Sequence, residues 1–580
     1  MKSLYGKMDW HQDSQNPVLF EGFSSFEERY DVAYTGLIFN QNRLLEEYRE
    51  PSFEKILLQM YLRQGVSFPK DLEGEFSIVI FDRLEQTLFA ARDRLGLQPL
   101  LYAYTPERIL IASELKYLLD MGLRRRLDET ALYQYLQLNY VPEPFTMFQD
   151  AQKLEAGNYL IASKHQIEVK PWYQLPQYEA QKEIPDYPIA QQTLRDLADK
   201  AIDRRIEGVS DFGTFLSGGI DSTVVTALTA QKTNRLKTFS IGYQDEPFFD
   251  ETAFAELVSK RYNTEHHVFK LSNQDLLESL QAVMSQTSEP YADSSGLALN
   301  RLCKMTEPYC PVILSGDGCD ELFAGYNKHS AELRVRERGF LFRLALLGAP
   351  LWSVLPQSRH AFLGNKIRQL NRFAQGGKLT PAERYWRWCS LTGETEAARL
   401  LSVNVDKAAY RNAKSEHLRY FTPDGDFNEC LYTDLHLVLN GDMIPKVFLN
   451  ATPYNLSVRA PFLDTEIVEY VMRLPYNYKI NGDIRKKILR ETFCTEIPEA
   501  LYNRPKRGFE VPLLKWFRTD LKPLIHELLN EDLIRSQGIF NPQAIAVLKD
   551  RIHLPNAGES AAQVFALLMF QNWWKKWLNQ

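Results

Sequence analysis

The chain has 580 residues, more than one hydrophobic core normally supports, so we expect two or more domains. Hydrophobic residues at 44% and charged residues at 24% are typical of a globular protein and exclude a disordered chain. The formal net charge of −6 excludes a nucleic-acid binder that relies on general electrostatic attraction.

Cysteine usage and the apolar segments indicate a protein of the cytoplasm. The six cysteines form no CxxC pair, which predicts a reducing compartment and no zinc ribbon. The opening MKSLYGKMDWHQD has no apolar core, so we expect no secretory signal there. The most apolar long stretch, residues 339–356, contains Arg343 and two prolines. It is predicted to be a buried helix or core segment rather than a membrane span.

The first part of the chain, up to about residue 185, is rich in short β-branched or aromatic runs bounded by turns, which predict strands. Residues 171–190 then combine prolines with mixed charge and interrupt any periodicity, so we expect a linker there. This gives two expected domains, 1–185 and 186–580. The predicted strands of the first are DVAYTGLIF, GEFSIVIFD, QTLFAAR, PLLYAYT and RILIASE.

Beyond the linker, strands and helices alternate in a pattern that predicts a parallel sheet with helices on both faces. In the helix expected over ETAFAELVSKRY, Phe254, Leu257 and Val258 share one face. From about residue 330 onward the sequence is mostly helical. The expected strands are GTFL (213–216), LKTFSIG (236–242), HHVFKL (266–271) and PVILSG (311–316).

The segment FLSGGIDST, residues 215–223, joins the first of these strands to a helix. Its two glycines let backbone N–H groups approach an anion, and the helix adds its positive N-terminal end. Ser217, Ser222 and Thr223 add hydroxyl donors, and Asp221 is a candidate magnesium ligand. The chain has no GxxxxGK[ST], and this turn has no GxGxxG, which excludes the two best-known phosphate loops. A plain strand–helix turn is the alternative.

The context of this loop favours a phosphate site. SGGIDS resembles the pyrophosphate loop of the N-type ATP pyrophosphatases, and almost all of residues 200–520 resembles asparagine synthetase. In the first part, LEGEFSIVIFD and LFAARDRLGLQPLLY resemble the N-terminal-nucleophile (Ntn) glutaminase domain of the same family. The further matching motifs are LKTFSIGYQDEPFFDETAFAELV, the histidine pair His266 and His267, SEPYADSS, VILSGDGCDELFAGYNKH, RAPFLD, INGDIRKKILRETF and RPKRGFEVPLLKWF.

The resemblance implies a two-domain α+β and α/β fold. Residues 1–185 would form an Ntn-hydrolase-like sandwich of antiparallel sheets. Residues 186–580 would form an adenine-nucleotide α-hydrolase-like parallel sheet with helices on both faces and a helical C-terminal part.

The resemblance also assigns site residues. Asp221 and Asp320 match the family's magnesium-holding acids, Lys486 matches a cation at the adenylate, and Asp317 matches an acid that is a candidate proton acceptor. The alternative for Asp320 is a helix N-cap, and the alternative for Lys486 is a solvated helix lysine beside Lys487. The histidine pair is predicted to be structural, because no third metal ligand stands at a suitable spacing. The implied nucleotide contacts are Leu216, Ser217, Gly218, Gly219, Asp221, Ser222, Ile241, Ser315 and Gly316.

The first part departs from the glutamine-dependent members of the family. Their catalytic cysteine follows the initiator methionine, whereas this chain has Lys2 and Ser3, and its first cysteine is Cys303. TGLIFN replaces the family's NGEIYN, and PSFE replaces SDTE. The family's HRGPD segment is not recognisable in this chain. We therefore expect that glutamine hydrolysis is lost. The substituted pocket positions are Thr35, Leu37 and Ser52.

The second part departs before RAPFLD, where KVFLNATPYNLSVR replaces a pattern such as KVDRMSMAxSLEVR. Phe448 and Leu449 stand for a charged pair and Ser457 for a glutamate. Either this helix is repacked, or the pocket near the adenylate is less polar. The second alternative would mean that aspartate is not the acyl donor.

The resemblance implies an ATP- and Mg²⁺-dependent, AMP-forming amide synthetase. Its partners would be a small-molecule or peptide carboxylate and either ammonia or an amine, with no nucleic acid or membrane. The sequence is compatible with a homodimer but does not set the oligomeric state. The alternatives are an asparagine synthase with supplied ammonia, an intramolecular amide- or lactam-forming cyclase like the β-lactam synthetases and lasso-peptide cyclases, and a catalytically silent regulator. The intact Asp221, Asp320 and Lys486 argue against a silent regulator.

Overall fold

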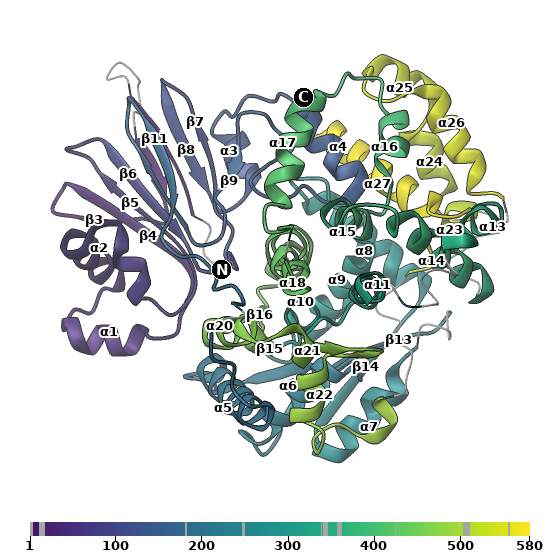
Figure 1. The fold of residues 1–580 in the computed structure, drawn as a ribbon. Helices are drawn as coiled ribbons and strands as arrows, with labels where there is room; N and C mark the ends of the chain where they lie inside the picture. The colour runs from purple at the N-terminus through teal and green to yellow at the C-terminus, as the bar shows by residue number, and fades with distance from the viewer. Residues whose placement is uncertain are drawn as a thin grey trace.

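The structure is a computed structural model of the chain. It describes residues 4–10, 18–179, 182–245, 250–337, 339, 346–355, 362–423, 425–502, 511–554 and 557–579. Figure 1 shows two antiparallel sheets on one side, a parallel sheet below, and helices over the remainder of the molecule.

Two antiparallel sheets make up most of the first part, which confirms the predicted fold there. One has the strand order β2-β1-β8-β7-β9 and the other the order β11-β10-β6-β5-β4-β3. The first contains β1 (Tyr5–Asp9), β2 (Val18–Glu21), β7 (Leu101–Tyr104), β8 (Arg108–Ala112) and β9 (Gln152–Lys153). The second contains β3 (Ser24–Phe26), β4 (Tyr30–Ile38), β5 (Gly74–Asp82), β6 (Thr87–Arg92), β10 (Asn158–Ala162) and β11 (Ile167–Pro171).

Alternation along β5 explains how the sheets stack. Val79 and Phe81 point into the core between the two sheets, while Ile78 and Ile80 belong to the core on the opposite face. That face is covered by α1 (Gln41–Tyr48) and α2 (Phe53–Gln64), as Figure 1 shows. The strand β5, apolar on both faces, is therefore buried on both faces.

The parallel sheet of the second part also matches the prediction. Its strand order is β14-β13-β12-β15-β16, and all its pairs are parallel. Along the chain the sheet's strands and the helices between them are α5 (Tyr187–Ile206), β12 (Phe212–Phe215), α6 (Ile220–Ala230), β13 (Lys237–Tyr243), α7 (Thr252–Tyr262), β14 (Glu265–Leu271), α8 (Asn273–Gln286), α9 (Ser295–Thr306), β15 (Val312–Leu314) and β16 (Ser457–Arg459).

Helices cover both faces of this sheet. Leu314 of β15 shares a core with α5, α6 and α7, whereas its neighbour Ile313 shares the opposite core with α8 and α9. The face predicted for α7 is partly wrong: Val258 is buried, but Leu257 is 45% exposed. Ala255 takes the place expected of Leu257 in the core, because α7 turns its 255–258 edge toward the sheet.

The rest of the described chain is mostly helical, as predicted. The long apolar stretch is an exception in its burial: the described part includes Leu347, Leu351 and Val354, all more than half exposed. The prediction of a buried segment is therefore wrong for residues 346–355, where α13 (Ala349–Val354) packs on α14 (Phe362–Gly376) and leaves an apolar edge outside. No described helix is long and apolar enough to cross a membrane.

The remaining helices frame the cavity described below. They include α4 (Glu129–Leu138) from the first part, and α10 (Cys319–Leu322), α11 (Asn327–Glu337), α15 (Pro381–Cys389), the π-helix η3 (Leu435–Met443), α19 (Ile444–Ala451), α22 (Lys487–Thr492), α23 (Leu513–Arg518) and α27 (Ser560–Trp573). Away from the cavity, α20 (Thr465–Arg473) packs on α5.

The order of the parallel strands fixes where a ligand fits. After β12 the chain leaves toward β13 on one side, and it returns to β15 on the other side of β12. At such a reversal the loops that leave the carboxyl ends of the two neighbouring strands diverge and open a crevice. The loops after β12 and β15 are the two glycine-containing segments singled out in the sequence.

Candidate active site

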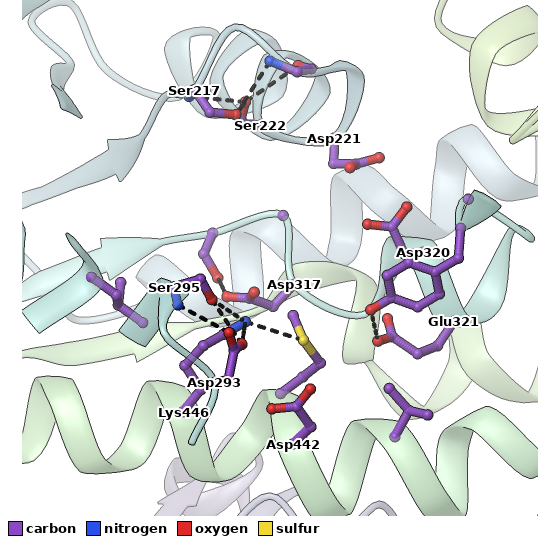
Figure 2. Close-up of a pocket in the computed structure, with 18 of the residues that line it drawn as sticks. Ser217, Asp221, Ser222, Asp293, Ser295, Asp317, Asp320, Glu321, Asp442 and Lys446 are labelled. Atoms are coloured by element: carbon purple, nitrogen blue, oxygen red, sulfur yellow. Dashed lines mark hydrogen bonds and ion pairs between the residues drawn. The ribbon is translucent and has the colours of Figure 1, made fainter. Parts of the chain in front are cut away.

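A cavity of about 830 Å³ lies at this crevice, and we call it the main cavity. Figure 2 shows the loop after β12 facing the loop after β15, with the helix that carries Asp442 and Lys446 closing the other side. Of the residues assigned by resemblance, the described lining contains Leu216, Ser217, Gly219, Asp221, Ser222, Ile241, Ser315, Gly316, Asp317, Asp320 and Lys486.

The loop after β12 is held in shape by its own hydroxyl groups. The backbone N–H of Ser217 donates to Oγ of Ser222 at 3.2 Å, and the N–H of Gly219 donates to Oγ of Ser217 at 3.3 Å. Gly219 is the N-cap of α6, an eleven-residue helix. The positive end of α6 and two hydroxyl groups therefore face the cavity, which suits an anion such as a phosphate.

The loop after β15 touches the first loop at one point. A Cβ on Gly316 would lie 2.7 Å from Cβ of Asp221, so only glycine allows this approach. In the same loop Oγ of Ser315 donates to Oδ2 of Asp317 at 2.7 Å. Burial raises the pKa of the Asp317 carboxyl, and the Ser315 hydroxyl opposes this. The raised pKa makes Asp317 a better proton acceptor than an ordinary exposed aspartate.

Lys486 joins the two loops. Its Nζ lies 2.6 Å from Oδ2 of Asp221 and 2.7 Å from Oδ1 of Asp320, and the residue is 6% exposed. Burial alone would lower the pKa of Lys486, but the two carboxylates raise it above its usual value. The ammonium is therefore charged and fixed at the meeting point of the loops. This placement contradicts the alternative of a solvated helix lysine.

The two carboxylates fit a magnesium ion. Both lie beside one ammonium, so these two acids together would hold the ion, and Oδ1 of Asp221 is buried without a partner among the described residues. No cluster of three or more metal-binding side chains occurs in the described ranges. Mg²⁺ commonly takes only one or two protein carboxylates together with substrate phosphates and water, so this donor set suffices.

Gly325 controls the position of Asp320 and Lys486. A Cβ there would lie 1.9 Å from Oδ1 of Asp320 and 2.1 Å from Cε of Lys486. Gly325→Ala should therefore displace both side chains, and we expect at least a 10-fold loss of the AMP-forming activity that the sequence resemblance implies, since misplacement by about 1 Å costs up to 100-fold. The measurement is the steady-state rate of AMP release from ATP.

The matched control is Gly393→Ala. Gly393 is the N-cap of α16 (Glu394–Leu400), and a Cβ there would meet nothing nearer than 4.0 Å. That variant should keep the wild-type rate, and circular dichroism should show both variants folded. Full activity in Gly325→Ala would mean that the Asp320–Lys486 geometry is not needed.

A second charged group in the cavity wall was not predicted as a site. Nζ of Lys446 lies 3.1 Å from Oδ2 of Asp293 and 3.4 Å from Oγ of Ser295, and Asp442 lies one helical turn before Lys446. Figure 2 shows these residues beside Asp317. Asp293 stands within the quoted SEPYADSS motif, and the four-residue spacing of Asp442 and Lys446 in an apolar helix was the available signal for the rest.

The structure separates other expected residues from the cavity. Gly218 does not line it and packs against Phe254, and Thr223 is fully buried in α6. Asp320 lies inside the first turn of α10, whose N-cap is Gly318, so the N-cap alternative is wrong. Nδ1 of His266 bonds Oγ1 of Thr238 at 2.8 Å, and the ring of its neighbour His267 stacks on Phe239, contacts that fit their structural interpretation.

The departures in the second part lie outside the main cavity. Phe448 and Leu449 sit on α19 and line a 120 Å³ cavity toward the first part of the chain. Phe448 also borders a 70 Å³ cavity behind Ser315 and Asp317. Ser457 lies in β16, where its Oγ accepts a hydrogen bond from Nε of Arg459 at 3.2 Å. These positions favour a repacked helix over a change in the wall of the main cavity.

The described departures in the first part lie at the start of α2 and in β4, and Ser52 has a structural role there. Ser52 is the N-cap of α2, and its Oγ accepts from the N–H of Lys55 at 3.3 Å. Thr35 and Leu37 lie in β4, and Oγ1 of Thr35 is buried without a partner among the described residues. Lys2 and Ser3 lie outside the described residues, as do residues 504–510 of the RPKRGFEVPLLKWF motif.

Comparison with known proteins gives two family matches. The model of the family described as asparagine synthase matches residues 193–575, and that of the glutamine amidotransferase domain matches residues 8–173. Asparagine synthetase [glutamine-hydrolyzing] 1 of Bacillus subtilis is 26% identical, with 94% of this chain and 85% of the relative covered. The putative asparagine synthetase [glutamine-hydrolyzing] 2 of Methanocaldococcus jannaschii is 30% identical, with 68% and 75% covered. Amidase chyE of Penicillium rubens is 24% identical, with 93% and 83% covered.

Proposed function

The chain belongs to the asparagine synthase family and is a carbon–nitrogen ligase, and on that premise we propose that it joins a carboxylate to ammonia or an amine by way of an acyl-adenylate. The observation that carries the proposal is the ammonium of Lys486 held between Asp221 and Asp320, at the junction of the loops after β12 and β15. Metal-binding acids and a fixed cation are what the departure of pyrophosphate requires.

The proposed roles follow from the geometry. ATP binds with its phosphates on the Ser217–Ser222 loop, and Leu216 and Ile241 provide apolar contacts for the nucleotide. A Mg²⁺ ion held by Asp221 and Asp320 would neutralise charge on the departing pyrophosphate. Lys486 faces the same developing charge, and its own charge requires no proton transfer during the step.

The bond changes are those of an acyl transfer through adenylate. A carboxylate oxygen attacks the α-phosphorus, the bond to the bridging oxygen breaks, and pyrophosphate leaves. The nitrogen nucleophile then attacks the carbonyl carbon, and AMP leaves with the electron pair of the broken C–O bond. Asp317 accepts a proton from the nitrogen, which its raised pKa supports.

A labelled carboxylate tests this proposal directly. With ¹⁸O in both carboxylate oxygens, one labelled oxygen should appear in AMP for each amide formed. The measurement is mass spectrometry of the nucleotide after turnover. Formation of ADP and phosphate, or AMP that carries no label, would contradict adenylation of the carboxylate.

We further propose that residues 1–185 form a separate domain whose glutaminase function is lost, with the synthetase domain over 186–580. The matched amidotransferase region, 8–173, contains no cysteine and so offers no thiol nucleophile. The serine at position 52 is engaged in capping α2 rather than free for a substrate. The domain then serves as a scaffold that adds residues 138–140 to the main cavity.

The purified protein should therefore release no glutamate from glutamine, with or without ATP. A nucleophile of the required kind and the polar contacts that would hold glutamine are both missing, and each such contact is worth about 1–3 kcal/mol when its partner is left unpaired. A coupled glutamate assay checks this. The matched comparison is ammonium chloride as nitrogen source, and sustained glutamate release from homogeneous protein would overturn the proposal.

A further inference from the structure

One wall of the main cavity is apolar and comes from helices that the phosphate chemistry does not use. Leu138 ends α4, Val438 lies in the π-helix η3, and Phe565 lies in α27, and all three line the cavity and are at least nine-tenths buried. Phosphates and magnesium need the polar loops on the other side. With about 830 Å³ the cavity is near the upper end of single-ligand pockets, so it has room for a second molecule.

Next to this wall the cavity carries an excess of negative charge. Asp293, Asp317 and Asp442 all line it, and Lys446 is the ammonium that balances them, at 3.1 Å from Asp293. One ammonium neutralises one of three carboxylates. A ligand with a positive charge therefore meets a complementary surface there, whereas an added carboxylate would be repelled.

Lys328, which also lines the cavity, offsets this excess only in part: its charge lowers the pKa of Asp442, but that pKa stays raised. Its Nζ lies 2.7 Å from Oδ1 of Asp434, which is fully buried. That pair is neutral by itself, and its charge is already satisfied.

A buried hydroxyl group in the same wall lacks a partner. Tyr140 is 4% exposed and lines the cavity, and its Oη has no hydrogen-bond partner among the described residues. Its ring lies on the backbone of Gly441, where a Cβ would be 2.4 Å from Cε2, so the phenol is beside Asp442. A buried hydroxyl without a partner costs free energy, which a bound ligand with a donor would recover.

The titration of Asp442 fits the excess of negative charge. Burial, together with the neighbouring Asp293 charge, raises the pKa of Asp442 to about 6. Oη of Tyr291 donates to Oδ1 of Asp442 at 2.5 Å and keeps that carboxylate in place. Asp442 is thus held in one orientation, and the positive charge around it does not fully compensate its ionised form.

We propose that the nitrogen nucleophile of this enzyme is a primary amine with an apolar body, which binds as an ammonium ion at Asp442 and Tyr140 and packs its body on Leu138, Val438 and Phe565. This inference rests on the proposed function and names the substrate class of its second step. Free ammonia would leave the apolar wall unused.

The step balances as follows. The ammonium group loses one proton to the carboxylate of Asp317, and the neutral nitrogen forms the C–N bond at the carbonyl of the acyl-adenylate. The C–O bond to the phosphate breaks, and AMP leaves with the electron pair. The nitrogen releases its second proton to solvent, so the products are an N-substituted amide, AMP and two protons.

The test is equilibrium binding to the full-length protein by isothermal titration calorimetry, with n-hexylamine as the probe. Hexan-1-ol has the same body without charge, hexanoate has the opposite charge, and ammonium chloride has the charge without the body. We expect hexylamine to bind saturably and at least 10-fold more tightly than each of the other three. Equal or tighter binding of hexanol, hexanoate or ammonium would overturn the inference.

Two variants locate the site. Asp442→Asn should weaken hexylamine at least 10-fold and leave hexanol unchanged, because the amide keeps the shape and can still accept from Tyr291. The matched control is Asp483→Asn, an acid 82% exposed in the β17–β18 hairpin (Ile480–Asn481 and Ile484–Arg485) and outside the cavity lining, which should bind like wild type. An unchanged affinity in Asp442→Asn would overturn the assignment, and the wild-type comparison of amine with alcohol stands even if that variant fails to fold.

The same preparation separates this inference from the proposed function. MgATP binding and carboxylate-dependent ATP–pyrophosphate exchange without saturable hexylamine binding would overturn the amine and keep the ligase. Hexylamine binding with no nucleotide binding would overturn the reaction and with it the role of the amine as nucleophile. With a carboxylate that supports exchange, mass spectrometry should find the N-hexyl amide.

Discussion

Asp221→Asn should lower the rate of AMP formation by about 100- to 1,000-fold, the range observed when one preorganised electrostatic group is removed from an active site. Asp221 contributes one oxygen to Lys486 at 2.6 Å and leaves its other oxygen buried without a partner among the described residues. Asparagine keeps the size of the side chain but lacks the charge that a magnesium ion and the ammonium both need. The measurement is initial rate against magnesium concentration.

The fold should survive this change. Lys486 retains Asp320 as its partner at 2.7 Å, so its buried charge is not left alone. Asp211→Asn is the matched control, since Asp211 also pairs with a lysine, Lys237 at 2.9 Å, but lies outside the cavity lining. The control should keep the wild-type rate. Wild-type turnover by Asp221→Asn would show that the metal is held elsewhere.

Lys486→Met should reduce the turnover number by about 100- to 1,000-fold and change the affinity for MgATP far less. In the proposed mechanism the ammonium is needed where charge develops during bond breaking, whereas the nucleotide is held mainly by the Ser217–Ser222 loop. Nucleotide affinity from equilibrium binding, compared with the single-turnover rate, separates the two effects.

Lys487→Met is the control for this substitution. Lys487 is adjacent in sequence but does not line the main cavity, and its Nζ lies 3.0 Å from Oε2 of Glu491. It should keep the rate of the wild-type protein. If Lys486→Met lost nucleotide affinity and rate by the same factor, Lys486 would have a structural role in the ground state instead.

The loops of the site could be predicted from the sequence because their signals are local. Two glycines and hydroxyl residues after a short apolar strand define the 216–222 loop, and the SGDG segment after β15 has the same character. Lys486 was located only through a family resemblance. Its contact with Asp221 joins residues 265 positions apart in sequence, which no local pattern specifies.

The residues that were missed depend on packing between distant elements. Asp442 interrupts an apolar helical run, and its four-residue spacing from Lys446 was its local signal, but it faces the cavity because the π-helix η3 continues directly into α19. Tyr140 reaches the cavity from the first part of the chain. Burial was wrongly predicted for Leu257 and for residues 346–355 for the same reason. Periodicity predicts a helix, but the neighbouring elements decide which face of that helix is covered.

The central claim is that this chain activates a carboxylate as an acyl-adenylate, and ATP–pyrophosphate exchange tests it most directly. Purified protein is incubated with ATP, Mg²⁺ and labelled pyrophosphate in the absence of any amine, against a panel of carboxylic acids that includes aspartate. The account predicts that one class of carboxylate drives label into ATP, and that Asp221→Asn slows this exchange by about 100- to 1,000-fold. MgATP cleaved to ADP and phosphate, or exchange that is independent of every carboxylate, would contradict it.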